Sequence, residues 1–110
     1  MIELLLYVSA EGGSPFEDWF SRLDAAAAAK ITVAMGRLEQ GNLSGVKGVG
    51  QGVQEYRLDW GPGYRIYFGR DGDAVVLLLI GGTKQRQQRD IEAAQLFWVD
   101  YKKRRLKRPG

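Results

Sequence analysis

The chain has 110 residues, 45% of them hydrophobic, a length and composition that predict one small globular domain. It contains no histidine and no cysteine, which excludes a disulfide framework, a thiolate nucleophile and a zinc-type ligand set. No apolar run approaches the ~20 residues that span a bilayer, and the N-terminus lacks the basic segment of a signal peptide, so we expect a cytoplasmic protein.

Positive charge is concentrated in two parts of the chain. The net charge is +3, but residues 42–89 carry +3 and residues 102–108 carry +6, whereas residues 1–41 and 90–101 each carry −3. This distribution is typical of a nucleic-acid binder, although a solvated terminus explains the basic tail equally well. We therefore predict a domain over residues 1–101 and a basic tail over residues 102–110.

The first third of the chain predicts a buried strand over residues 1–8, followed by two amphipathic helices that form a hairpin on a sheet. The residues expected to cap these two helices are Ser14, Pro15, Glu17, Asp24 and Gly41. The glycine-rich stretch over residues 41–52 resembles a phosphate-cradling loop but lacks the Gly-Lys-Ser/Thr ending. It is therefore interpreted as a flexible connector.

Residues 53–60 and 64–68 alternate between apolar and polar side chains, which predicts two antiparallel strands. A three-residue Gly61-Pro62-Gly63 loop would pair Leu58 with Ile66 and Tyr56 with Phe68. The same register sets Asp59 opposite Arg65 and Arg57 opposite Tyr67. These polar residues would then share one open face of the sheet.

Asp71-Gly72 predicts a type I′ turn into a third strand. That turn pairs Phe68 with Val75, Ile66 with Leu77 and Tyr64 with Leu79, and leaves Val76, Leu78 and Ile80 on the opposite face. A final helix capped by Thr83 and running to about Tyr101 is expected to cover this second apolar face; the alternative is a partner protein. The predicted core residues are Trp19, Phe20, Leu58, Ile66, Phe68 and Leu77, and Leu77→Ala should cost about 2–5 kcal/mol.

Two stretches carry a family resemblance. G-P-G-Y-R-I-Y-F over residues 61–68 and L-L-I-G-G-T-K-Q-R-Q-Q-R-D-I over residues 78–91 together resemble the RelE/ParE superfamily of toxins from type II toxin–antitoxin systems. The chain is most similar to the phage-derived addiction-module killer-protein branch, which is HigB-like. The resemblance implies an α+β RelE-like fold: a strand, two helices, three strands and a helix, with the helical hairpin on a mainly antiparallel four-stranded sheet.

The resemblance also implies a function. It implies a toxin that inhibits translation as a ribosome-dependent mRNA endoribonuclease, without a metal or other cofactor, by attack of the 2′-hydroxyl on the phosphodiester. The implied partners are the ribosome, mRNA and a cognate antitoxin with a helix-turn-helix DNA-binding domain, with no membrane partner and with DNA contacted only through the antitoxin.

Candidate site residues follow from the polar face and from the resemblance. Arg65, Lys84, Arg57 and Tyr67 are candidates for phosphate contact, charge stabilisation and base stacking, and Glu55 is a candidate general base. The structural alternatives are a cross-strand pair with Asp59 for Arg65, solvated strand residues for Arg57 and Glu55, and simple packing for Tyr67. Candidates for contact with RNA or the ribosome are Lys47, Arg86, Arg89, Lys102, Lys103, Arg104 and Arg105.

Two rival hypotheses stay open. The ParE branch of the same scaffold inhibits DNA gyrase by protein contact and has lost the catalytic basic residues, whereas this chain keeps Arg57, Arg65 and Lys84. An inactive toxin that only binds its antitoxin is the third reading. Assays of supercoiling, translation and growth arrest discriminate the three.

Overall fold

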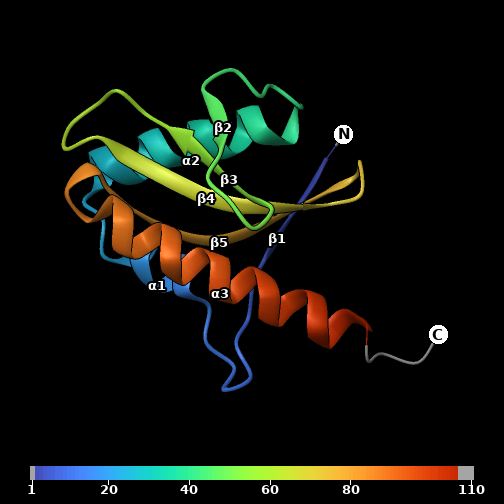
Figure 1. The fold of residues 1–110 in the computed structure, drawn as a ribbon. Coiled ribbons are helices and arrows are strands. Elements are labelled where there is room, and N and C mark those ends of the chain that lie inside the picture. The colour runs from blue at the N-terminus through green and yellow to red at the C-terminus, as the bar shows by residue number, and fades with distance from the viewer. Residues whose placement is uncertain (1, 107–110) are drawn as a thin grey trace.

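The computed structural model describes residues 2–106, except for the side chain of Leu106, and shows an α+β domain built on a mixed five-stranded sheet. The strands lie in the order β1-β5-β4-β3-β2, with helices on both faces (Figure 1). The elements are β1 (Glu3–Leu6), α1 (Pro15–Ser21), α2 (Ala25–Glu39), β2 (Val46–Gly48), β3 (Val53–Arg57), β4 (Tyr64–Asp71), β5 (Val75–Thr83), a 3₁₀ turn η1 (Lys84–Arg86) and α3 (Gln87–Leu106).

Both helices of the predicted hairpin form and begin at the predicted caps, because these caps are local. The Ser14 hydroxyl accepts a hydrogen bond from the Glu17 N–H at 3.2 Å, and the Asp24 carboxylate accepts one from the Ala27 N–H at 2.8 Å. Gly41 takes a positive φ of 76° just past the end of α2, and its N–H bonds the Leu38 carbonyl.

The sheet has one strand more than expected, and its first strand is placed differently. β2 forms inside the glycine-rich stretch that the sequence predicts as a connector, where Lys47 pairs antiparallel with Glu55. β1 pairs parallel with β5 at the sheet edge, so Leu5 and Leu6 are 40% and 37% exposed. The predicted strand therefore forms, over Glu3–Leu6, but the prediction that it is buried is wrong; Met1 lies outside the described residues.

The register of β3 against β4 differs by two residues from the predicted one. Tyr56 pairs with Ile66 and Arg57 with Arg65, because the Leu58 N–H bonds the Tyr64 carbonyl and the chain turns over a wider loop, 58–63. A shift of two preserves the face of every side chain. Arg57, Arg65 and Glu55 therefore still share one face.

The predicted register of β4 against β5 is wrong as well, and here the faces change. A three-residue loop pairs Asp71 with Val75, and an irregularity between Tyr67 and Phe68 shifts the pairing again. Val76 and Leu78 consequently join Phe68 in a core cluster with Phe16 of α1 and with α2. Leu77 and Leu79 instead face α3, together with Tyr67, Val53 and Trp98.

α3 covers one face of the sheet, but over Leu77 and Leu79 and not over Val76 and Leu78 as predicted, and it begins and ends differently. Thr83 makes no side-chain cap bond, and η1 precedes the helix, which continues beyond the predicted end at Tyr101 through Leu106. Residues 107–110 of the predicted basic tail lie outside the described residues. Of the predicted core, Ile66, Phe68 and Leu77 are buried, while Trp19, Phe20 and Leu58 are only partly buried.

Candidate active site

A buried carboxylate lies at the centre of the polar side chains on the α3 face of the sheet. Glu55 occupies the middle of β3, opposite Lys47 of β2 and Tyr67 of β4. The Glu55 side chain is 0% exposed. An isolated carboxylate would be costly to bury at this position, so its partners decide whether the site is stable.

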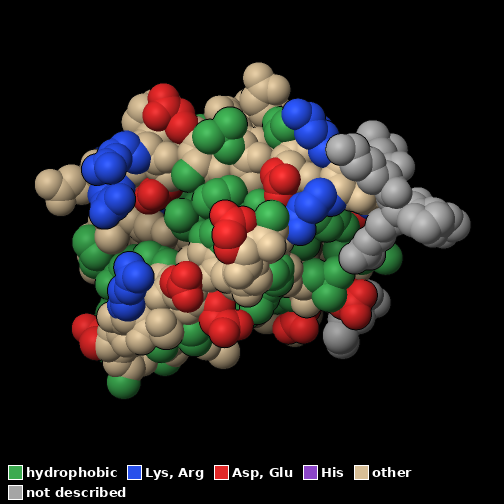
Figure 2. Space-filling model, turned by 90° about the horizontal axis from the view of Figure 1, so that it is seen from below, with side chains coloured by type: hydrophobic (Ala, Val, Ile, Leu, Met, Phe, Trp, Pro, Cys, Tyr) green, Lys and Arg blue, Asp and Glu red, His purple; other side chains and the backbone are tan. Residues whose placement is uncertain are grey.

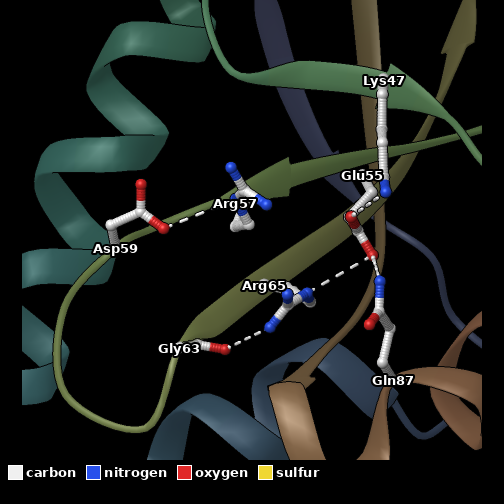
Figure 3. Close-up of polar contacts among 7 residues, drawn as sticks. All are labelled: Lys47, Glu55, Arg57, Asp59, Gly63, Arg65 and Gln87. Carbon is white, nitrogen blue, oxygen red and sulfur yellow. Dashed lines mark hydrogen bonds and ion pairs between the residues drawn. The ribbon is translucent and has the colours of Figure 1, made fainter.

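Three side chains surround this carboxylate (Figure 3). Gln87, in the first turn of α3, donates a hydrogen bond from Nε2 to Oε2 at 3.0 Å. Arg65 Nε lies 3.6 Å from the same oxygen, and Lys47 Nζ lies 3.7 Å from Oε1. Two cations from the neighbouring strands thus offset the desolvation of one carboxylate, and the group as a whole stays positive.

The two arginines of the site differ in their access to solvent. Arg65 is only 5% exposed, and its Nη1 also donates to the Gly63 carbonyl at 2.8 Å. The Arg57 side chain is 54% exposed and pairs with an exposed carboxylate, its Nε lying 3.5 Å from Asp59 Oδ1. Arg57 is therefore the more accessible of the two to a ligand, and Arg65 acts mainly on Glu55.

Tyr67 lies beneath α3 and is 0% exposed. Burial, and then the negative charge of Glu55, raise the pKa of Tyr67 well above its usual value. Its ring has no exposed face on which a base could stack in this structure. The prediction that Tyr67 stacks a splayed base is therefore not supported by its position, because it assumed an uncovered face.

A hollow of about 230 Å³ opens beside Glu55 and is lined by Gly45, Val46, Lys47, Glu55 and Arg57. Lys47 is 61% exposed here. Among the described residues, no hydrogen-bond donor reaches Oε1 of Glu55. The hollow thus brings together one proton acceptor and two accessible cations. No group of three or more acidic side chains in residues 2–106 could hold a metal ion there.

Of the three basic residues that follow β5, one lies beside this site. The Lys84 N–H bonds the Pro62 carbonyl at 3.4 Å, and a Cβ added to Gly63 would lie 3.2 Å from the Lys84 Cβ, so Lys84 adjoins the loop that holds Arg65. Arg86 and Arg89 are exposed at the start of α3. Their charges oppose the effect of burial, which raises the pKa of Asp90.

The basic residues at the end of α3 lie elsewhere. Seen from below, Lys and Arg side chains gather toward the start of α3 and toward its C-terminal end, with apolar and acidic side chains between (Figure 2). Arg104 bonds Asp100 at 3.0 Å, Arg105 pairs with Asp71, and Lys102 Nζ lies 5.5 Å from the centre of the Trp98 ring. Arg104 lies seventeen residues beyond Gln87 of the site, and along a helix this separation is roughly 25 Å. The structure therefore does not bring Lys102, Lys103, Arg104 or Arg105 to the candidate site.

Sequence reasoning missed one residue of the site, Gln87, and one buried carboxylate that lines another hollow, Asp90. Gln87 belongs to the motif that carries the family resemblance, but the sequence assigned it no role. Its hydrogen bond to Glu55 depends on how α3 packs on the sheet. Asp90 is 6% exposed and lies over Gly82, where an added Cβ would come within 1.8 Å of its Oδ2. The preceding Gly81 is covered from α1 by Trp19 in the same way, at 2.2 Å. The Gly-Gly pair was the signal for both close approaches.

Comparisons with known proteins give one relative and no functional description. No family model matches the chain. A Haemophilus influenzae protein named "Uncharacterized protein" is 42% identical over 83 residues, which is 74% of this chain and 84% of the relative. Within residues 2–106, no helix is long and apolar enough to cross a membrane. At this identity and coverage, the chain belongs to the same family as that Haemophilus influenzae protein.

Proposed function

We propose that this protein is the toxin of a type II toxin–antitoxin module and acts in the cytoplasm as a ribosome-dependent mRNA endoribonuclease. The observation that carries the proposal is the hollow in which Glu55 lies between Lys47 and Arg57. The order of strand, helical hairpin, antiparallel strands and helix also agrees with the RelE/ParE resemblance, with β2 added. The implied antitoxin, ribosome and mRNA partners are part of the proposal.

The three groups match the demands of cleavage by the 2′-hydroxyl. Movement of the exposed Lys47 side chain opens the buried Oε1 to the RNA. Glu55 then accepts the 2′ proton, the 2′ oxygen attacks phosphorus, and the bond from phosphorus to the 5′ oxygen breaks. Lys47 donates a proton to the departing 5′ oxygen, and the products are a 2′,3′-cyclic phosphate and a 5′-hydroxyl. Arg57 stabilises the negative charge that develops on the phosphorane.

The buried residues serve this chemistry by holding Glu55 in place. Arg65 and Gln87 both contact Oε2, which leaves Oε1 toward Lys47 and the hollow. We assign them positioning roles, in place of the direct phosphate contact that the resemblance implies for Arg65. Lys84 lies next to the Gly63 loop, where it can contact the RNA backbone beside the cut.

Primer extension on an mRNA in a translating extract tests the proposal. Wild-type protein should produce cuts that require ribosomes, and Glu55→Gln and Lys47→Ala should each reduce them at least tenfold. Asp73→Asn is the matched control, because it removes an exposed carboxylate in the loop between β4 and β5, outside both hollows. Absence of cuts with wild-type protein, together with inhibition of gyrase supercoiling, would contradict the nuclease and favour the ParE-like alternative.

A further inference from the structure

A second hollow, of about 240 Å³, lies between α2 and the chain from Tyr56 to Trp60. From α2 it is lined by Lys30, Val33, Ala34 and Arg37, which at this spacing form one face of the helix. Arg57 lines both this hollow and the one beside Glu55. Arg57 is thus the residue that the two hollows share, and we call the hollow beside α2 the α2 groove.

The charges of the two hollows favour an anion. Lys30, Arg37, Arg57 and Lys47 line the two hollows, against the two carboxylates Glu55 and Asp59. Lys30, Arg57 and Lys47 stand in exposed positions, and Arg37 reaches across from α2 to donate to the Tyr56 hydroxyl at 3.4 Å. Cations spaced along a groove are the arrangement that follows a phosphate backbone.

The groove also contains an aromatic platform. The Trp60 ring lies 5.9 Å from the Tyr64 ring in a stacked arrangement, and Lys30 Nζ lies 5.5 Å from the centre of the Trp60 ring. Val33, an apolar side chain that is 55% exposed, lines the same hollow. A nucleobase stacked on Trp60 would release the Lys30 ammonium to a phosphate, and base stacking is stronger than an exposed cation–π contact.

We propose that this α2 groove binds single-stranded RNA and leads it to Glu55. Lys30, Arg37 and Arg57 contact successive phosphates, and Trp60 stacks a base. The inference rests on the proposed nuclease function for its direction, but it concerns binding, which can be measured separately. In this proposal, Arg57 contacts the bound RNA where it passes from the α2 groove to Glu55.

The test is binding of a fluorescent, uncleavable 2′-O-methyl RNA decamer to the full chain, measured by anisotropy over a range of salt. Lys30→Ala with Arg37→Ala should raise Kd at least tenfold and lower the slope of log K against log salt by about 1.4, since each lost phosphate contact removes about 0.7. Trp60→Ala should raise Kd and leave the salt slope unchanged; Trp60→Phe should bind nearly as wild type, and serves if Trp60→Ala does not fold. Arg22→Ala with Arg70→Ala, which removes two charges elsewhere, should bind as wild type.

Each outcome decides something. Weakened binding in the groove variants alone supports the proposal, even if primer extension finds no cuts, in which case only the nuclease fails. Equal binding by wild type, groove variants and control overturns the groove, even if mRNA is cut normally. No binding by wild type overturns it too.

Discussion

Arg57 and Arg65 lie directly opposite each other on β3 and β4. Like charges in a cross-strand pair destabilise a sheet. Glu55 lies 3.6 Å from Arg65 Nε and Asp59 lies 3.5 Å from Arg57 Nε, so part of the repulsion is offset. Each arginine is thus paired with one carboxylate, and the repulsion between the two arginines is reduced but not removed.

Arg57→Gln should separate stability from function. Removing this charge relieves the repulsion of Arg65, so the free energy of unfolding should stay constant or rise by about 0.2–1 kcal/mol. Cleavage should fall at least tenfold, since one hydrogen bond from a charged group to the phosphate contributes about 1.5–3 kcal/mol. Urea unfolding and primer extension measure the two. Arg22→Gln is the control, and a loss of more than 1 kcal/mol in Arg57→Gln would contradict the repulsion argument.

Glu55→Gln should be strongly destabilising. It leaves the Arg65 guanidinium buried without its counter-charge, and breaking such a pair costs about 3–5 kcal/mol. Asp59→Asn breaks an exposed pair and should change stability by less than about 1 kcal/mol. Urea unfolding compares the two variants. Equal, small effects would mean that the buried carboxylate contributes little to the fold.

Gly69→Ala and Gly36→Ala should act in opposite directions. A Cβ at Gly69 would lie 2.3 Å from a Trp98 ring carbon, so overpacking should destabilise the fold by about 1–3 kcal/mol. A Cβ at Gly36, inside α2, meets nothing within 4 Å and should stabilise by about 0.5–1 kcal/mol. Thermal unfolding measures both. If Gly69→Ala left the stability unchanged, α3 would have to be able to shift away from β4.

Tyr7 should make stability depend on pH above pH 10. Burial, and then its hydrogen bond to Asp100, raise the pKa of Tyr7 to about 12. The unfolded tyrosine ionises near pH 10, so this contribution is complete below about pH 10 and is lost as the pH rises toward 12. The difference in unfolding free energy between wild type and Tyr7→Phe should therefore be constant to pH 10 and shrink above it. A constant difference up to pH 12 would contradict the raised pKa.

The parts of the fold that were predictable from sequence depend on local chemistry. The caps at Ser14, Asp24 and Gly41 are set by residues within four positions, and all three are confirmed. The strand registers were not predictable, because they depend on how wide the 58–63 loop is and on the irregularity beside Tyr67. A shift by an odd number of residues on β5 was enough to exchange its two faces.

The candidate site was partly predictable for the same reason. Alternation along β3 placed Glu55 and Arg57 on one face, and that holds. The sequence alone favoured a surface position for Glu55. Its burial depends on β2, which was not predicted, and on Gln87, which is distant in the sequence. Tyr67 was expected on an open face of the sheet. It is covered by α3, because Trp98 of α3 packs against Gly69, and this long-range contact could not be predicted from the sequence.

The parallel pairing of β1 with β5 sets an order on folding during synthesis. Glu3 pairs with Val75, and Leu6 with Leu78, so β1 has no strand partner until β5 has been made. Long-range parallel pairing of this kind forms slowly. The leucines of β1, which lie at the sheet edge, therefore gain their strand partner only after β5 has been synthesised.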